Sequence, residues 1–357
     1  MNKILCICMF WLGVQFAFGQ TSTIQVEMEE ASWEIPEDAQ FEDFEGRQTL
    51  VMKGGRASVK DLDFENGSIE VDVYATKKRS FAGITFRKQK DNMDEVYMRM
   101  HKSSQVDAVQ YTPIFNNESN WQLYREYQAK VTFADQGWNT LRIEVHFNRA
   151  DVFVNEEKVL SIDDLRTGHQ KGQIGLFALF SSRFSNFRVT HKDLEEEPTF
   201  MDYVELDPAV IRSWDISPAR RYNEGMVRFT SFEKKKYTTV ETEDSGLLPI
   251  SKYVRKSSSG NFEQNVDEYI VAKTSVEVAE EMTRRFSFDY SDKIIVYLNG
   301  KEVFKGNNAF RTKGLQYAGH LNINTNTLYL PLEKGVNTIH CVIIDKANGW
   351  GLMGKLD

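Results

Sequence analysis

The chain has 357 residues and a formal net charge of −8, with 44 Lys and Arg against 52 Asp and Glu. An acidic chain without a basic stripe does not suit nucleic acid, because phosphate binding needs clustered Lys and Arg. After residue 19, no segment has the ~20 apolar residues of a membrane-spanning helix. We therefore expect neither nucleic acid nor a membrane span, and the length allows two domains with separate cores.

The first nineteen residues are typical of a secretory signal peptide. Lys3 supplies positive charge, Ile4 to Val14 is a short apolar run, and Ala17-Phe18-Gly19 is a small-x-small cleavage site. A lipoprotein anchor is the alternative, but Cys6 and Cys8 lie before or inside the apolar run rather than after it. We expect a secreted or periplasmic protein that is cleaved near Gly19.

Cleavage there leaves Cys341 as the one cysteine, so no intramolecular disulfide can form. Cys341 lies in the alternating segment 338–344, which predicts a buried, apolar thiol. The fold then depends on its hydrophobic cores.

Residues 48–188 alternate between apolar and polar side chains with a period of two. In residues 68–74, for example, Ile69, Val71 and Val73 share one face. Turn residues such as Asn66-Gly67 and Gln136-Gly137 separate the short strands. This spacing predicts an antiparallel β-sandwich.

A second alternating region follows an acidic segment, Asp193 to Pro198, that reads as a linker. Asp207 to Ile211 predicts a short helix, with Asp207 as its N-cap. The expected organisation is a signal peptide (1–19), a sandwich (20–192), a linker (193–212) and a jelly roll (213–357), which makes the fold all-β.

Two hairpins with the same pattern occur late in each half. The segment 142–160 turns at Asn155-Glu156, and 286–306 turns at Asn299-Gly300. Asn-Gly favours the two positive φ angles of a type I′ turn, so the second hairpin is the stronger prediction.

Both halves resemble known carbohydrate-related families. Phe64 with Gly67 to Val73, Gly137 to Arg142, and Gly172 to Leu176 resemble the concanavalin A-like lectin/glucanase (laminin-G-like) superfamily over residues 25–191. The segments 292–300, 329–332 and 335–337 are similar to the galactose-binding-like jelly roll. The resemblance implies a secreted bacterial protein whose partner is a glycan or polysaccharide.

The glucanase motif of that superfamily, Glu-x-Asp-x-(x)-Glu, is incomplete here. Glu70 and Asp72 occupy its first two positions, but Tyr74 or Ala75 stands where the second glutamate belongs. Retaining hydrolysis needs two carboxyls about 5–5.5 Å apart. Glu70 and Asp72 therefore read as the polar face of a strand, which argues against this catalytic route and leaves enzyme activity by another route open.

The best ligand-binding candidate is a mixed aromatic and polar cluster. Tyr97, Arg99 and His101 are predicted to share a strand face, and planar hydrogen-bonding groups beside rings suit sugar recognition. An internal polar network that ties loops to the sandwich explains the same residues equally well. The candidate residues are Tyr97, Arg99, His101, Asp107, Gln110, Tyr111, Trp121 and Tyr124.

No cofactor is expected, because the six histidines lack metal-ligand spacing. A structural calcium ion with oxygens from Asp289 and Asp292 stays open. Trp350, framed by glycines, is predicted to pack inside the second half.

Three functions remain at this point. The first is a non-catalytic carbohydrate-binding protein, motivated by two lectin-like sandwiches. The second is a saccharide-active enzyme, similar to a glycoside hydrolase, that uses Arg99, His101 and Asp107. The third is an envelope scaffold that binds other proteins. The sequence does not indicate an oligomeric state.

Overall fold

The computed structural model describes residues 21–76, 78–194, 207–233, 236–257 and 265–357. Within those ranges, none of the helices has the length and apolar character needed to cross a bilayer.

The strands of the first half are β1 Thr21–Val26, β2 Trp33–Glu34, β3 Gln40–Phe44, β4 Arg47–Phe64, β5 Gly67–Tyr74, β6 Phe81–Gln89, β7 Asn92–Met98, β8 Val109–Phe115, β9 Glu118–Ser119, β10 Gln128–Ala129, β11 Trp138–His146, β12 Arg149–Val154, β13 Glu157–Ile162 and β14 Gly172–Lys192, with the 3-10 helix η1 Met100–Lys102. Those of the second half are β15 Ser213–Ile216, β16 Arg220–Arg221, β17 Thr238–Glu241, β18 Leu247–Pro249, β19 Glu268–Val278, β20 Met282–Ser291, β21 Lys293–Leu298, β22 Lys301–Asn307, β23 Asn326–Leu332, β24 Gly335–Asp345 and β25 Gly351–Leu356, with η2 Phe229–Ser231 and α1 Ile250–Tyr253.

The first half is one antiparallel sheet that curls into two layers, in the order β10-β8-β7-β6-β14-β5-β11-β12-β13. The long strand β14 belongs to both layers: its first part pairs with β6 and β4, and its last part pairs with β5 and β1. The apolar faces meet between the layers, where Val71, Ile84 and Val96 are fully buried. This confirms the prediction of an all-β, antiparallel sandwich.

The second half packs a seven-stranded sheet against a four-stranded one. Trp214, Phe286 and Trp350 lie in the core between them. Trp350 therefore packs inside, as predicted, and its Nε1–H donates to the Ile343 carbonyl at 3.2 Å. Cys341 is a buried free thiol, also as predicted.

Both predicted hairpins are present. Asn299 and Gly300 have φ angles of 48° and 82°, and Asn155 and Glu156 have 50° and 67°. Two positive φ angles in a row define the type I′ turn, whose twist matches that of the flanking strands.

The predicted helix over Asp207–Ile211 is wrong. Residues 207–211 form a turn, in which Asp207 accepts from the Ala209 N–H at 3.0 Å and Val210 bridges to Lys355. The pairing with Lys355 draws the backbone away from a helical path. The signal peptide (1–19) and residues 195–206 of the predicted linker lie outside the described residues, so those boundaries stay predictions.

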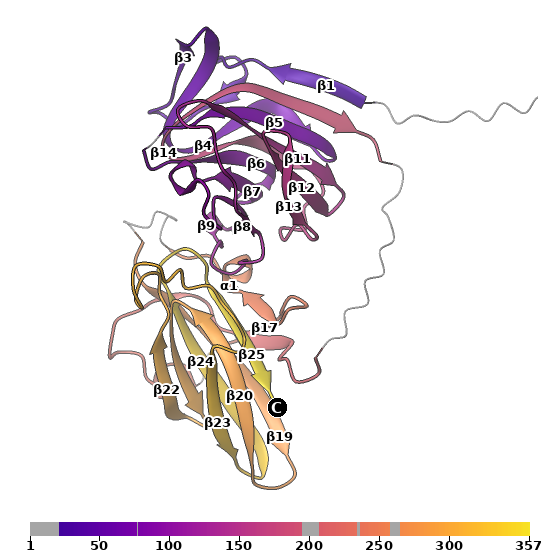
Figure 1. Cartoon of the computed structure of the whole chain (residues 1–357). Helices are drawn as coiled ribbons and strands as arrows, with labels where there is room; N and C mark the ends of the chain where they lie inside the picture. Colours follow the sequence, from indigo (N-terminus) through magenta and orange to yellow (C-terminus); the bar gives the residue numbers. More distant parts are fainter. Residues whose placement is uncertain (1–20, 77, 195–206, 234–235, 258–264) are drawn as a thin grey trace, which may run out of the picture.

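The end of the first half that carries β8 and β9 lies against the second half, near α1 (Figure 1). Between β9 and β10, Gln122 is fully buried, and its side chain donates to the Ala318 carbonyl at 2.6 Å. Leu247 of the second half belongs to the core cluster of the first. The halves therefore share packed surface.

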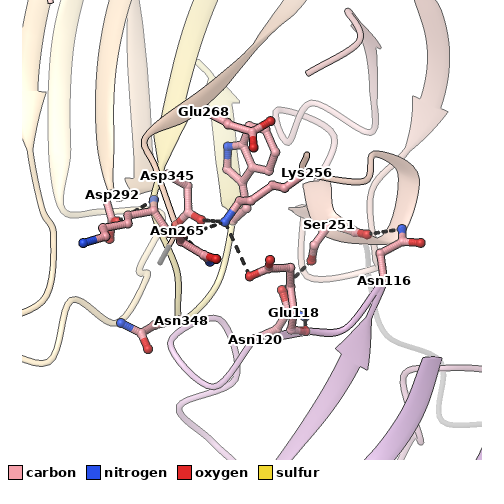
Figure 2. Close-up of polar contacts among 12 residues, drawn as sticks. Asn116, Glu118, Asn120, Ser251, Lys256, Asn265, Glu268, Asp292, Asp345 and Asn348 are labelled. Carbon is pink, nitrogen blue, oxygen red and sulfur yellow. Dashed lines mark hydrogen bonds and ion pairs between the residues drawn. The ribbon is translucent and has the colours of Figure 1, made fainter. Parts of the chain in front are cut away.

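A buried ionic network lies at the same junction (Figure 2). Lys256, whose side chain is 1% exposed, pairs with Asp345 of β24 and lies 3.5 Å from Glu118 of β9. Burial alone would lower the pKa of Lys256, but Asp345 and Glu118 raise it. We call Lys256, Glu118, Asp345 and the adjacent Asp292 the Lys256 network.

Candidate functional site

One outer face of the first sandwich carries a row of residues that crosses six strands. The strand registers pair Arg56 with Phe177, Phe177 with Gly83, Gly83 with Tyr97, Tyr97 with Gln110, and Gln110 with Gln128. Directly paired residues point to the same face of a sheet. We call Arg56, Phe177, Tyr97, Gln110 and Gln128 the band.

From Arg56 to Gln110, neighbours along the band are in contact. The Arg56 guanidinium lies 5.1 Å from the Phe177 ring centroid, and the Phe177 and Tyr97 rings are 5.8 Å apart. The residue between these rings has to be glycine, because a Cβ on Gly83 would lie 2.1 Å from the Val96 carbonyl oxygen. The Tyr97 hydroxyl donates to Gln110 Oε1 at 2.8 Å.

Beside the band, Arg99 forms an ion pair with Asp107 and donates to Gln110 Oε1 at 3.3 Å. The side chains of Arg99 and Asp107 are 14% and 21% exposed, whereas Tyr97 and Gln110 are buried. The structure thus unites four predicted residues, Tyr97, Arg99, Asp107 and Gln110. Arg99 and Asp107 form the part nearest to solvent.

An exposed apolar patch lies next to Arg99. Phe81 contacts Arg99, with 5.3 Å between the guanidinium and the ring centroid, and the Phe81 and Phe180 rings are 6.2 Å apart. Leu179 and Phe180 are 44% and 42% exposed. Phe180 has a φ of 66°, which is rare for a bulky residue and costs backbone strain. We call Phe81, Leu179 and Phe180 the apolar patch.

The prediction that Tyr97, Arg99 and His101 share one strand face is wrong, because β7 ends at Met98 and the chain turns into η1. His101 lies on η1, beside the apolar patch, with 5.1 Å between its ring and that of Phe81. Its Nδ1 is 3.2 Å from the Ser80 carbonyl, so Nδ1 carries the proton and Nε2 keeps its lone pair. Burial lowers the pKa of His101, which keeps the imidazole neutral at pH 7. His101 is therefore suited to accept a proton.

Tyr111 and Tyr124 do not belong to this surface, which corrects the predicted cluster. Adjacent strand residues point to opposite faces, so Tyr111 turns into the core when Gln110 faces out. The Tyr111 hydroxyl donates to buried Asp94 at 2.7 Å. Tyr124 is 1% exposed and donates to Glu243 of the second half at 2.7 Å.

Trp121 lies apart from Arg99, at the sheet edge where the halves meet. Its Nε1–H donates to Asn348 at 3.1 Å, and its ring contacts Phe310 and His320 edge-on, each at 5.7 Å. Trp121 is half-buried.

The outer face of the other layer is filled by ion pairs. Glu70 pairs with Arg188, and Asp72 accepts from Arg47, Thr140 and Asn186. Glu70 and Asp72 are thus polar-face residues, as predicted. Two hollows lie on this side: one of about 350 Å³ has Arg47, Gln48 and Asn186 in its lining, and one of about 230 Å³ has Glu70 and Arg188.

Among the described residues, no group of three or more His, Cys, Asp or Glu side chains is arranged to hold a metal ion. Asp289, the predicted calcium ligand, accepts from Asn308 at 2.7 Å and from the Asn322 and Tyr290 backbone N–H groups at 2.9 Å. Its carboxylate therefore stabilises the segment between β22 and β23. Asp292 belongs to the Lys256 network.

Several solved structures are similar to part of this chain. The carbohydrate-binding module CBM66 from Bacillus subtilis is 14% identical, with a TM-score of 0.35, over 48% of this chain and 95% of the other. A β-1,3-1,4-glucanase (lichenase) from a mouse hindgut metagenome is 14% identical, with a TM-score of 0.36, over 48% and 99%. A Bacillus subtilis protein with a galectin-like fold is 9% identical, with a TM-score of 0.37, over 50% and 100%.

Part of the first half is similar to a family whose description names a sugar. Residues 26–190 match the family model described as a 3-keto-alpha-glucoside-1,2-lyase-like domain. No curated protein matches the chain. The expected resemblance to carbohydrate-related sandwiches therefore holds for residues 26–190.

The apolar patch was missed in the sequence, although a signal was present. Alternation is regular over 173–178 and 184–189 and breaks between them. The structure has a register shift there, between Leu179 and Ser182. Two exposed apolar side chains at such an irregularity are a stronger site signal than regular alternation.

Proposed function

We propose that this chain binds a saccharide on the outer face formed by the band, the apolar patch and Arg99. The single observation that carries the proposal is the strained, 42% exposed Phe180, whose ring lies 6.2 Å from Phe81, the ring that the guanidinium of Arg99 contacts. A ring that packs against a sugar face, next to charged groups that bond its hydroxyls, is the combination that sugar recognition needs.

Two further points support this proposal. The family match over residues 26–190 is to a domain named for a glucoside. The buried Tyr97 and Gln110 fix the orientation of Arg99 from below, because Gln110 Oε1 accepts from both. A pre-oriented guanidinium loses little side-chain entropy when a ligand binds.

The test is glycan-array screening of residues 20–357, followed by calorimetry with the strongest glycan. Arg99→Ala should weaken binding by about tenfold or more, because it removes charged hydrogen bonds. Arg47→Ala is the matched control, since Arg47 also pairs with an aspartate beside an aromatic ring, but on the other layer. Binding to no glycan at high micromolar concentration, or equal losses in both variants, would overturn the proposal.

A second candidate function is elimination on a 3-keto-α-glucoside at the same site, favoured by the family match and by the tautomer of His101. His101 Nε2 removes the C2 proton, which the neighbouring C3 ketone acidifies. The C2–H electron pair forms the C1=C2 bond as the C1–O bond breaks, and the released alkoxide takes a proton. Arg99 stabilises the negative charge that develops on the ketone oxygen.

A chromogenic 3-keto-α-glucoside tests this activity. Wild type should release the alcohol, while His101→Ala and Asp107→Asn should not. The rate should fall as the pH drops through the lowered pKa of His101, because the protonated imidazole has lost its lone pair. If His101→Ala keeps the wild-type rate, His101 is not the base. If the wild type releases no alcohol, this reaction is wrong and saccharide binding without it remains.

We further propose that the chain acts outside the cytoplasm and that residues 213–357 are a galactose-binding-like jelly roll. The signal-like residues 1–19 and the segments 292–300, 329–332 and 335–337 support these two points. Amino-terminal sequencing of protein recovered from the periplasm or medium tests the first.

A further inference from the structure

The band does not stop at the edge of the first sandwich. Gln128, its last member, lies on β10 and donates from its side-chain amide to His320 Nε2 at 3.1 Å. His320 lies between β22 and β23 of the second half. Residues distant in sequence thus continue one row of contacts.

Beyond Gln128, the row becomes aromatic. The rings of His320 and Trp121 are 5.7 Å apart, and Trp121 is also 5.7 Å from Phe310. All three side chains are half-buried, so each keeps some surface toward solvent. We call Trp121, Phe310 and His320 the junction rings.

The charges of Arg99 and Asp107, in the proposed site, affect the pKa of His320. Burial lowers the pKa of His320 to about 4, and the charges of Arg125, Asp107 and Arg99 also act on it. A neutral His320 that accepts from Gln128 carries its proton on Nδ1. It is then a hydrogen-bond donor with a flat face, both of which suit a sugar ring.

We propose that the junction rings form a second saccharide subsite, so that residues 309–321 of the second half complete the site on the first. This rests on the proposed function. From Phe177 to Gln128 the band crosses four strand spacings, about 19 Å. An oligosaccharide spans that distance, whereas a single sugar ring does not.

The experiment uses the full chain and gluco-oligosaccharides from glucose to the hexasaccharide, in α-1,4 and β-1,3 linkage, measured by calorimetry. Affinity in the wild type should rise with chain length. Phe310→Ala and His320→Ala should weaken binding of the longest oligosaccharide by about tenfold and leave that of the shortest one that binds unchanged. Leu315→Ser is the matched control, because Leu315 lies on the same loop and is 80% exposed.

The outcomes separate the two ideas. If Arg99→Ala abolishes binding while Phe310→Ala and His320→Ala do not affect any length, the second subsite is wrong and the first stands. Affinity that is independent of length in the wild type also overturns the subsite. If no glucan binds and the glycan array is negative too, both proposals fail. A His320→Gln variant, which keeps a hydrogen-bonding amide, guards against a folding defect in His320→Ala.

Discussion

The Arg99–Asp107 pair beside the band and the Lys256 network are both built on ion pairs, but they differ in burial. Both join charged and polar side chains from several strands, and both reach the contact between the halves. In the network, Lys256 and Asp345 are 1% and 0% exposed. Beside the band, Arg99 and Asp107 are partly open to solvent, and Phe180 is 42% exposed.

This difference indicates separate roles. Lys256 is held by Asp345 and Glu118 away from solvent, so its charge is used within the fold. The exposed ring of Phe180 and the partly exposed Arg99 can both contact a ligand. Variants in the network should therefore change stability, and variants beside the band should change binding.

The largest effect is expected for Lys256→Met. Loss of the ammonium leaves Glu118 and Asp345 buried without their cation, which should lower the free energy of unfolding by about 3–5 kcal/mol. Urea denaturation measures it. Arg255→Ala is the control, because Arg255 also joins the halves, through Asp91, but both side chains are exposed. Its cost should be below about 1 kcal/mol, and a similar loss in both variants would contradict the assigned role.

Next in size is Arg99→Lys. A lysine keeps the charge but loses the planar guanidinium whose Nη1 donates to both Asp107 and Gln110, so saccharide affinity should fall about tenfold. The melting temperature should change less than in Lys256→Met. A variant that binds normally but melts much lower would place Arg99 among the structural residues.

Phe180 allows a sharper separation of the two properties. Phe180→Ala should weaken binding severalfold, because the stacking ring is lost. Phe180→Gly should weaken binding equally. Its free energy of unfolding should be about 1 kcal/mol higher than that of Phe180→Ala, since glycine adopts a positive φ without strain. Calorimetry and thermal melting of the two variants test both statements, and a less stable Phe180→Gly would refute the strain argument.

The smallest effect concerns pH. Burial and the charge of Asp345 raise the pKa of Asp292 to about 8, above the ordinary value of 3.8. The folded chain thus keeps a proton that the unfolded chain has released at neutral pH. Raising the pH from 7 to about 9 removes it, so the free energy of unfolding should fall by about 1 kcal/mol. Asp292→Asn should flatten this dependence, and an unchanged slope would show that another group titrates.

The sequence predicted local geometry well and long-range neighbours poorly. Alternation was enough to place Val71 in the core, and glycine framing was enough to bury Trp350. The prediction for Tyr111 was wrong for a local reason. It grouped residues 110 and 111 in one cluster, although consecutive strand residues face opposite sides of the sheet.

The rest of the candidate site depends on pairings between distant strands. Phe180 reaches Phe81, which in turn contacts Arg99, because β14 pairs with β6, although about a hundred residues separate the two phenylalanines. His320 reaches Gln128 through the packing of the two halves. Neither contact can be predicted from the alternation of residues in a single sequence.

The central claim is that the saccharide lies on the face of the band, and a crystal structure with the tightest-binding oligosaccharide tests it most directly. We predict a sugar ring against Phe180, with its hydroxyls hydrogen-bonded to Arg99 and Asp107. A ligand in the hollow of about 350 Å³ beside Arg47 and Asn186, on the other layer, would contradict the claim.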